Sequence, residues 1–274
     1  MASPAPIPAF LYGTAWKEER TEALTAQALS AGFRGIDTAN QRKHYFEAAV
    51  GQALASSRVA RSELFLQTKF TFQAGQDQRL PYDPKADIAT QVSQSFASSL
   101  EHLGTDYLDS YLLHGPSTRG RLQAADIAAW RALETLATSG RTRFIGVSNV
   151  SLAQLRELLE LCSVKPRFVQ NRCYAKTGWD REIRASCREQ DITYQGFSLL
   201  TANRSELAGK SMKQLVARTG RSAAELVFRF AVQAGMLPLT GTSSTEHLHL
   251  DLSALDFELN PADFATIEQL SALG

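Results

Sequence analysis

Eight short apolar runs, rich in β-branched or aromatic residues, alternate with helical patterns along the chain. This alternation, at roughly 30 residues per unit, is typical of repeated βα units, in which helices connect parallel strands. It constrains the fold more than any other feature of the sequence. The predicted strands span residues 9–16, 33–38, 64–69, 107–114, 142–148, 166–171, 191–197 and 235–240.

Several of the helices between these strands have recognisable ends. The segment 87–104 places Ile88, Val92 and Phe96 on one face, and Gly104 ends it. Segments 151–162 and 243–250 begin with Ser-x-x-Gln and Ser-x-x-Glu, the spacing of a capping box that starts at Ser151 or Ser243. Only 71–85 and 115–123 are predicted to be long loops, and each follows a strand.

No linker rich in Pro, Gly or Ser divides the chain, and its 274 residues, 44% of them hydrophobic, suffice for one large core. Eight strands, each followed by a helix, therefore predict an α/β fold: a single closed (β/α)8 TIM barrel over residues 1–274. A doubly wound open sheet is the alternative. The chain lacks G-x-G-x-x-G, G-x-x-x-x-G-K-[ST] and G-x-S-x-G, the motifs of open-sheet enzymes, so the barrel is favoured.

Composition excludes several classes of partner. The 29 Lys and Arg residues are scattered and balance 28 Asp and Glu, so no nucleic-acid partner is expected. The sequence has neither a signal-like N-terminus nor an apolar run of about 18 residues, so we expect no membrane partner and a cytoplasmic location. Three cysteines without a C-x-x-C indicate a reducing compartment, no disulfide framework and no metal site.

Active sites of (β/α)8 barrels lie at the carboxyl ends of the strands, and here every such end is polar. For a serine or asparagine this often means only that a loop begins there. A charged or titratable group facing the barrel mouth is more informative, because it must be paired or functional. The polar residues at these ends are Asp37, Lys69, His114, Ser148, Asn149, Gln170, Ser198, Thr242 and Ser243.

Tyr45, in the connection after the second predicted strand, is a candidate proton donor. A phenol has an intrinsic pKa of about 10, and a neighbouring cation such as Lys69 lowers it. Asp37 would then orient the lysine, while a neutral His114 hydrogen-bonds a substrate oxygen. The alternative is a purely structural Asp37–Lys69 ion pair beside a core histidine.

Six segments of the sequence resemble the aldo-keto reductase family. The resemblance covers essentially the whole chain, and the segments follow the family's order and spacing. They are 32-GFRGIDTA-39, His44-Tyr45 with Glu47, 66-LQTK-69, 107-YLDSYLLHGP-116, 143-RFIGVSN-149 and 238-PLTGTSS-244.

The resemblance implies a role for each matching residue. Asp37, Tyr45, Lys69 and His114 match the catalytic tetrad, in which tyrosine protonates a carbonyl oxygen as hydride arrives from a nicotinamide. Trp16 matches an aromatic residue of the substrate pocket. The residues that match cofactor contacts are Ser148, Asn149 and Gln170 for the carboxamide, Phe197 for stacking on the nicotinamide, Ser198 for the pyrophosphate, and Thr242 and Ser243 for a phosphate at the start of the last barrel helix.

The chain departs from the family in its first motif, where Asp37 and Glu47 are two residues farther apart than usual. If the position is counted back from Glu47 at the family's spacing, His44 is the proton donor. If it is chosen by the type of side chain, Tyr45 is the donor, because an imidazole would give its proton from a different atom and geometry. We predict Tyr45, with His44 lining the substrate pocket. Lys43 is then a solvated surface charge, and Glu47 is either a carboxylate at a helix N-terminus or a cofactor-side contact.

The cofactor is predicted to be NADP(H), with NAD(H) not excluded. Members that prefer NADP commonly carry Lys and Arg near the start of the last barrel helix, and 241-GTSSTEHLHLD-251 has neither. His247 or His249 would contact a 2′-phosphate, although neutral imidazoles give little preference, and both are equally typical of a helix surface. The sequence ends soon after a predicted helix over 261–273, without the long C-terminal tail that closes the pocket in many members of the family. We therefore expect an open pocket that accepts a broad range of carbonyl compounds, including bulky ones.

The resulting prediction is a monomeric NADPH-dependent reductase of aldehydes or ketones, acting on a small-molecule carbonyl substrate. One alternative is a nicotinamide-binding barrel with a regulatory or redox-sensing role and little turnover. Another is an aldolase-type barrel in which Lys69 forms a Schiff base.

Overall fold

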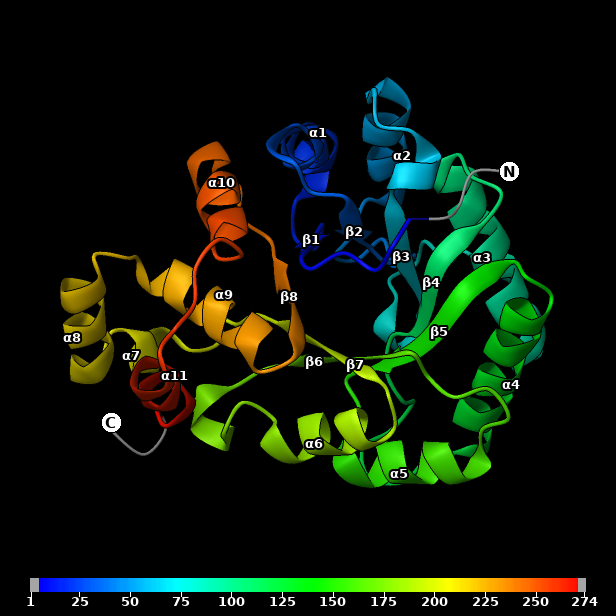
Figure 1. Ribbon diagram of the computed structural model, residues 1–274. Coiled ribbons are helices and arrows are strands. Elements are labelled where there is room, and N and C mark those ends of the chain that lie inside the picture. The colour runs from blue at the N-terminus through cyan, green and yellow to red at the C-terminus, as the bar shows by residue number, and fades with distance from the viewer. Residues whose placement is uncertain (1–4, 271–274) are drawn as a thin grey trace.

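The computed structural model describes residues 5–270, and its strands close into one parallel barrel in the order β1 to β8 (Figure 1). β8 pairs with β1, which completes the ring. All eight predicted strands are present, although the first two are only three residues long, so the predicted (β/α)8 fold is confirmed. The strands are β1 (Leu11–Gly13), β2 (Gly35–Asp37), β3 (Phe65–Phe70), β4 (Leu108–Leu113), β5 (Thr142–Ser148), β6 (Phe168–Arg172), β7 (Thr193–Phe197) and β8 (Met236–Thr240).

The helices surround the strands, with α7, α8 and α11 gathered next to α9 (Figure 1). The α-helices are α1 (Thr21–Ala31), α2 (Glu47–Ser56), α3 (Ile88–Leu103), α4 (Ala124–Thr138), α5 (Leu152–Leu161), α6 (Arg181–Glu189), α7 (Arg204–Leu207), α8 (Lys210–Thr219), α9 (Ala223–Gln233), α10 (Thr245–Ser253) and α11 (Pro261–Glu268). Short 3₁₀ helices are η1 (Glu18–Arg20), η2 (Arg61–Glu63), η3 (Gln73–Gly75) and η4 (Ala175–Thr177). The predicted helix over 261–273 corresponds to α11, and residues 271–273 lie outside the described part of the chain.

The predicted helix ends are confirmed at two positions and wrong at a third. Gly104 ends α3 with a φ of 61°, and Ser151 caps α5 by accepting the Gln154 N–H. For α10 the cap is Ser244 rather than Ser243, because Ser244 accepts the His247 N–H. Thr242 Oγ1 accepts the Ser244 N–H at 3.2 Å, which holds the chain in a turn until the helix begins.

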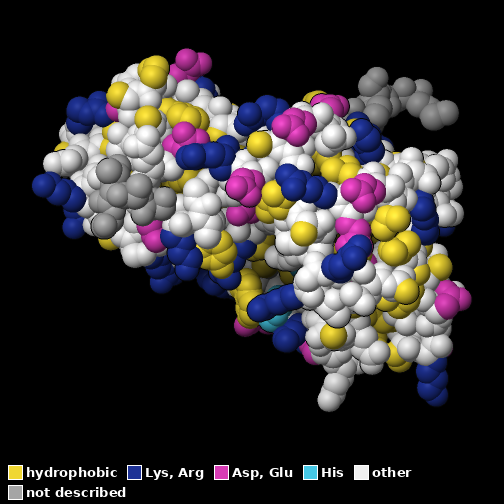
Figure 2. Space-filling view, turned by 90° about the horizontal axis from the view of Figure 1, so that it is seen from below, with side chains coloured by type: hydrophobic (Ala, Val, Ile, Leu, Met, Phe, Trp, Pro, Cys, Tyr) yellow, Lys and Arg dark blue, Asp and Glu magenta, His cyan; other side chains and the backbone are white. Residues whose placement is uncertain are grey.

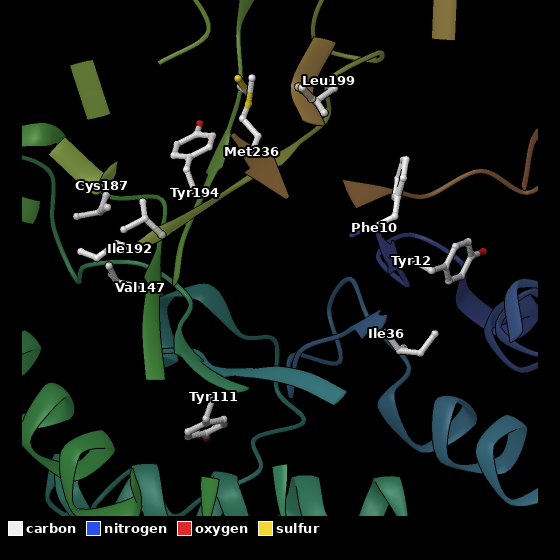
Figure 3. Close-up of a cluster of buried hydrophobic side chains, with 14 of the residues drawn as sticks. Phe10, Tyr12, Ile36, Tyr111, Val147, Cys187, Ile192, Tyr194, Leu199 and Met236 are labelled. Atoms are coloured by element: carbon white, nitrogen blue, oxygen red, sulfur yellow. The ribbon is translucent and has the colours of Figure 1, made fainter. Parts of the chain in front are cut away.

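Alternate side chains of each strand face opposite sides of the barrel wall. The outward set packs against the helices, as Figure 3 shows for Ile36, Tyr111 and Val147. The inward hydrophobic set includes Phe65 and Phe168, whose rings meet edge to face with centroids 5.7 Å apart. Because these rings come from the starts of β3 and β6, they fill the floor of the barrel and leave the carboxyl ends for a site.

Helix α2 approaches α3 closely at Gly51. A Cβ atom at Gly51 would lie only 1.8 Å from the carbonyl oxygen of His102, so no larger residue fits there without a shift of the backbone. This contact brings the buried first residue of α2, Glu47, within reach of the His102 side chain.

Two properties of the structure bear on the partners expected from the sequence: the length and hydrophobicity of its helices, and the distribution of charge on its surface. Within residues 5–270 no helix combines the length and the hydrophobicity needed to cross a membrane. Figure 2 shows acidic and basic side chains interspersed over one face, with hydrophobic atoms in small groups between them.

Candidate active site

Asp37 and Lys69 form a buried ion pair at the carboxyl ends of β2 and β3. The lysine ammonium lies 2.7 Å from each carboxylate oxygen and 2.8 Å from the Thr38 carbonyl oxygen. All three ammonium protons therefore have acceptors, and the Lys69 side chain is 0% exposed. Burial lowers the pKa of Lys69, while the Asp37 charge acts in the opposite direction. An amine bound in this way is a poor Schiff-base nucleophile, which argues against the aldolase alternative.

Three buried glutamine side chains surround the same carboxylate. Gln67 and Gln170 donate to Asp37 Oδ1 at 2.7 and 3.0 Å. Gln195 accepts from both of them, at 2.8 and 2.9 Å, and returns a hydrogen bond to Gln67 Oε1 at 3.0 Å. We call Gln67, Gln170 and Gln195 the glutamine cluster.

The strand register explains how the glutamine cluster forms, because Asp37 lies beside Gln67 and Gln170 lies beside Gln195. Only Gln170 was predicted from the sequence. The signal for Gln67 and Gln195 is a pair of amides at inward positions of β3 and β7, where apolar residues usually fill a barrel.

Tyr45 lies in the loop between β2 and α2, with its ring close to two other members of the predicted tetrad. The ring centroid is 5.5 Å from Lys69 Nζ and 5.8 Å from the His114 ring centroid. Burial, reinforced by the Asp37 charge, raises the pKa of Tyr45. The expectation of a lowered pKa is therefore wrong, because burial of the phenol and the Asp37 charge both favour its protonated form.

His114 follows β4 and is held by its backbone and its ring. Its N–H donates to the Phe70 carbonyl oxygen at 2.8 Å, and its Nδ1 lies 2.6 Å from Thr71 Oγ1. Burial, together with the Lys69 charge, lowers the pKa of His114 to about 3. The imidazole is therefore neutral at physiological pH, in the form that the sequence analysis assumed. Thr71 itself was not predicted.

A cavity of about 680 Å³ opens above these residues. Lys69 and Ser243 do not line it: Lys69 lies beneath the lining side chains, and Ser243 is exposed outside the cavity. The other predicted site residues do line it, namely Trp16, Asp37, His44, Tyr45, His114, Ser148, Asn149, Gln170, Phe197, Ser198, Thr242 and His247.

Trp16 and His44 form an aromatic wall on one side of this cavity. Their rings stack with centroids 3.8 Å apart at 33°, and the backbone N–H of Trp16 donates to the His44 carbonyl oxygen at 2.7 Å. Trp16 is 68% exposed and adopts a φ of 61°, a conformation that is uncommon outside glycine. The His44 ring is thus paired with an indole, whereas the Tyr45 ring is next to Lys69 and His114.

Polar groups suited to a carboxamide lie across the cavity. Asn149 Nδ2 donates to the His114 carbonyl oxygen at 2.8 Å and to Ser148 Oγ at 3.2 Å. Ser148 lies beside Gln170 in the strand register. Together these side chains present hydroxyl and amide groups, the donors and acceptors that a planar amide requires.

The end of the cavity near β8 contains a lysine that was not predicted. The Lys17 ammonium hydrogen-bonds the Gly241 carbonyl oxygen, next to Thr242. Burial, together with the nearby Arg20 charge, lowers the pKa of Lys17. His247 is exposed and lines the cavity, whereas His249 is exposed and does not.

Glu47 points away from the cavity. It is the first residue of α2, which confirms the expectation of a carboxylate at a helix N-terminus. Its carboxylate accepts a hydrogen bond from Thr68 Oγ1 and lies 3.0 Å from His102 Nδ1. The other expectation, a cofactor-side contact, is therefore wrong. Lys43 is exposed, as predicted. Residues 5–270 contain no group of three or more side chains suited to a metal ion.

Comparison with known proteins identifies the family. The model of the Aldo/keto reductase family matches residues 11–272. A glyoxal reductase of Bacillus subtilis is 32% identical over 92% of the chain and 84% of its own length. An NAD/NADP-dependent indole-3-acetaldehyde reductase of Schizosaccharomyces pombe is 29% identical over 100% of the chain and 93% of its length.

A solved structure agrees with this result. The crystal structure of an aldo/keto reductase from Brucella melitensis superimposes with a TM-score of 0.82 at 28% identity, covering 96% of this chain and 95% of that one. The chain therefore belongs to the aldo/keto reductase family and is an NAD(P)H-dependent oxidoreductase.

Proposed function

We propose that the protein reduces aldehydes or ketones to alcohols with NADPH, and that Tyr45 is the proton donor. The observation that carries this proposal is that the Tyr45 ring, which lines the cavity, is within 5.8 Å of both Lys69 Nζ and the His114 ring centroid. When bound, the nicotinamide supplies a hydride to the carbonyl carbon. The protonated phenol of Tyr45 gives its proton to the carbonyl oxygen, and the raised pKa keeps that proton in place until the substrate arrives.

The other tetrad members assist this step. Neutral His114 hydrogen-bonds the carbonyl oxygen and directs it toward the phenol. Lys69, held by Asp37, stabilises the phenolate that remains after proton transfer, because its positive charge is 5.5 Å from the ring centroid.

The chain's own residues fit a nicotinamide dinucleotide along the cavity. Ser148, Asn149 and Gln170 would hold the carboxamide, while Phe197 would stack on the ring. Ser198, Lys17 and Thr242 would face the phosphates, and His247 would lie near a 2′-phosphate. We propose NADPH as the preferred cofactor, with NADH as a weaker one, because His247 lines the cavity where the 2′-phosphate would lie. Lys17 would attract the phosphates that both cofactors share.

The substrate is proposed to be a small carbonyl compound that lies against the aromatic wall of Trp16 and His44. A flat or aromatic aldehyde suits stacked rings, and the exposed indole leaves room for bulky groups. We propose that the protein works as a monomer in the cytoplasm. The free thiols of Cys162, Cys173 and Cys187 fit a reducing compartment such as the cytoplasm.

The test is oxidation of NADPH, followed by its absorbance, with a panel of aromatic and aliphatic aldehydes and with NADH in parallel. Binding of both cofactors is measured separately by fluorescence. We expect turnover with reactive aldehydes and a higher kcat/KM with NADPH. Tight cofactor binding without reduction of any aldehyde would refute the reductase proposal and favour a regulatory barrel.

A further inference from the structure

The residue after β3, Thr71, contacts the imidazole ring of His114. Its hydroxyl oxygen lies 2.6 Å from His114 Nδ1, and Thr71 itself is only 6% exposed. The hydrogen bonds of the described residues give this hydroxyl no other partner. The direction of this one bond therefore decides which ring nitrogen carries the proton of the neutral imidazole.

Only one of the two directions satisfies both groups. If Nδ1–H donated to the threonine, the hydroxyl hydrogen would point into a buried region without an acceptor, which is unfavourable. If the threonine hydroxyl donates its hydrogen to Nδ1, both groups are satisfied and the imidazole proton is on Nε2. In this tautomer the Nε2–H group can donate a hydrogen bond to a carbonyl oxygen.

The loop that follows β3 fixes Thr71 in place. A Cβ atom at Gly75 would lie 2.8 Å from the Thr71 methyl carbon, so the glycine backbone packs directly against that methyl group. Tyr82 Oη donates to the Thr71 carbonyl oxygen at 2.8 Å, and Gln76 Nε2 donates to it at 3.4 Å. These contacts limit rotation of the side chain and keep the hydroxyl directed at the imidazole.

We propose that Thr71 is a positioning residue that holds His114 in the tautomer protonated on Nε2, so that the histidine donates a hydrogen bond to the substrate oxygen. The proposal rests on the proposed carbonyl reductase function and adds to it a residue that sets the direction of this hydrogen bond. No proton is transferred to or from the threonine during the reaction.

The first test measures the tautomer directly by long-range ¹H–¹⁵N NMR of the protein labelled with ¹⁵N-histidine. The chain has five histidines, and the spectrum of His114→Gln identifies the signals of His114. We expect the Nε2–H pattern in the wild type and a mixture of tautomers in Thr71→Val, which keeps the shape of threonine but lacks the hydroxyl. An Nδ1–H pattern in the wild type would overturn the proposal whether or not the protein reduces a carbonyl compound.

The second test is kinetic and compares Thr71→Val with Thr71→Ser. We expect valine to lower kcat/KM for an aromatic aldehyde about tenfold, the effect of losing roughly one hydrogen bond, with the NADPH Kd changed less than about twofold. Serine, which keeps the hydroxyl, should stay within about threefold of the wild type. If serine is as impaired as valine, packing of the methyl group explains the loss and the proposal is wrong.

The two tests separate failure of this proposal from failure of the proposed function. A wild type that binds NADPH but reduces no aldehyde contradicts the function, while the NMR pattern still decides the tautomer. Should Thr71→Val not fold, the wild-type spectrum and the Thr71→Ser kinetics each remain able to contradict the role of the hydroxyl.

Discussion

The ammonium of Lys69 is 2.7 Å from both carboxylate oxygens of Asp37, and neither side chain is more than 4% exposed. Two ions removed from water in this way depend on each other, because each would be strongly destabilised alone. Asp37→Asn should therefore lower the free energy of unfolding by about 3–5 kcal/mol, as measured by urea titration. Glu258→Gln serves as the control and should cost less than about 1 kcal/mol, because the Glu258 side chain is 84% exposed in its pair with Arg229. Equal losses in the two variants would show that the buried pair contributes no more than a surface pair.

The glutamine cluster should behave as one unit. Gln67→Leu and Gln195→Leu should each cost about 1–3 kcal/mol, because each leaves a buried amide without its partner. The double variant should cost less than the sum of the two, since it removes both members of the reciprocal pair. Urea unfolding measures the cycle, with exposed Gln52→Leu on α2 as the control for the substitution itself. Strict additivity would indicate that the two amides do not stabilise each other.

The pair of Glu47 and His102 should make stability depend on pH. The hydrogen bond that His102 donates to the Glu47 carboxylate raises the pKa of His102 above its usual value. When the histidine pKa is higher in the folded protein than in the unfolded chain, protonation stabilises the folded state. This contribution is fully present below the pKa of the unfolded chain, about 6.5, and is lost as the pH rises through the pKa of the folded protein. The difference in unfolding free energy between wild type and His102→Gln should thus be larger near about pH 5.5 than near about pH 8.5. A difference that is the same at both pH values would contradict this, and exposed His249→Gln is the control.

Lys17 should matter for cofactor binding more than for turnover. Lys17→Met should raise the NADPH Kd about tenfold, because a charge-assisted contact near Thr242 is lost, while kcat at saturating NADPH falls less than about twofold. Since burial lowers the pKa of Lys17, the advantage of wild type over the variant should decrease toward alkaline pH. Fluorescence titration measures the Kd, and Lys43→Met removes an exposed lysine as the control. An unchanged Kd would place Lys17 outside the phosphate site.

The fold and the positions of the strand ends were predictable from the sequence, because hydrophobic periodicity and strand spacing are local features. Asp37, Lys69 and His114 come together at the barrel mouth because parallel strands in sequence order place their carboxyl ends at one rim. The shift of the α10 cap to Ser244 was not predictable, since it depends on a turn closed by Thr242 Oγ1.

Contacts between side chains of distant strands could not be predicted from the sequence. Gln67 and Gln195 are 128 positions apart, and only the closure of the barrel shows that their amides meet. The direction of the Tyr45 pKa shift was mispredicted for a related reason. It depends on the burial of the phenol and on its distance from the Asp37 charge, and both depend on the three-dimensional structure.

The central claim, that Tyr45 rather than His44 is the proton donor, is tested most directly by NADPH oxidation with an aromatic aldehyde in wild type, Tyr45→Phe and His44→Ala. We predict that Tyr45→Phe loses at least about a hundredfold in kcat while still binding NADPH, and that His44→Ala retains kcat and changes mainly KM. The opposite pattern, with turnover retained in Tyr45→Phe and lost in His44→Ala, would contradict the account.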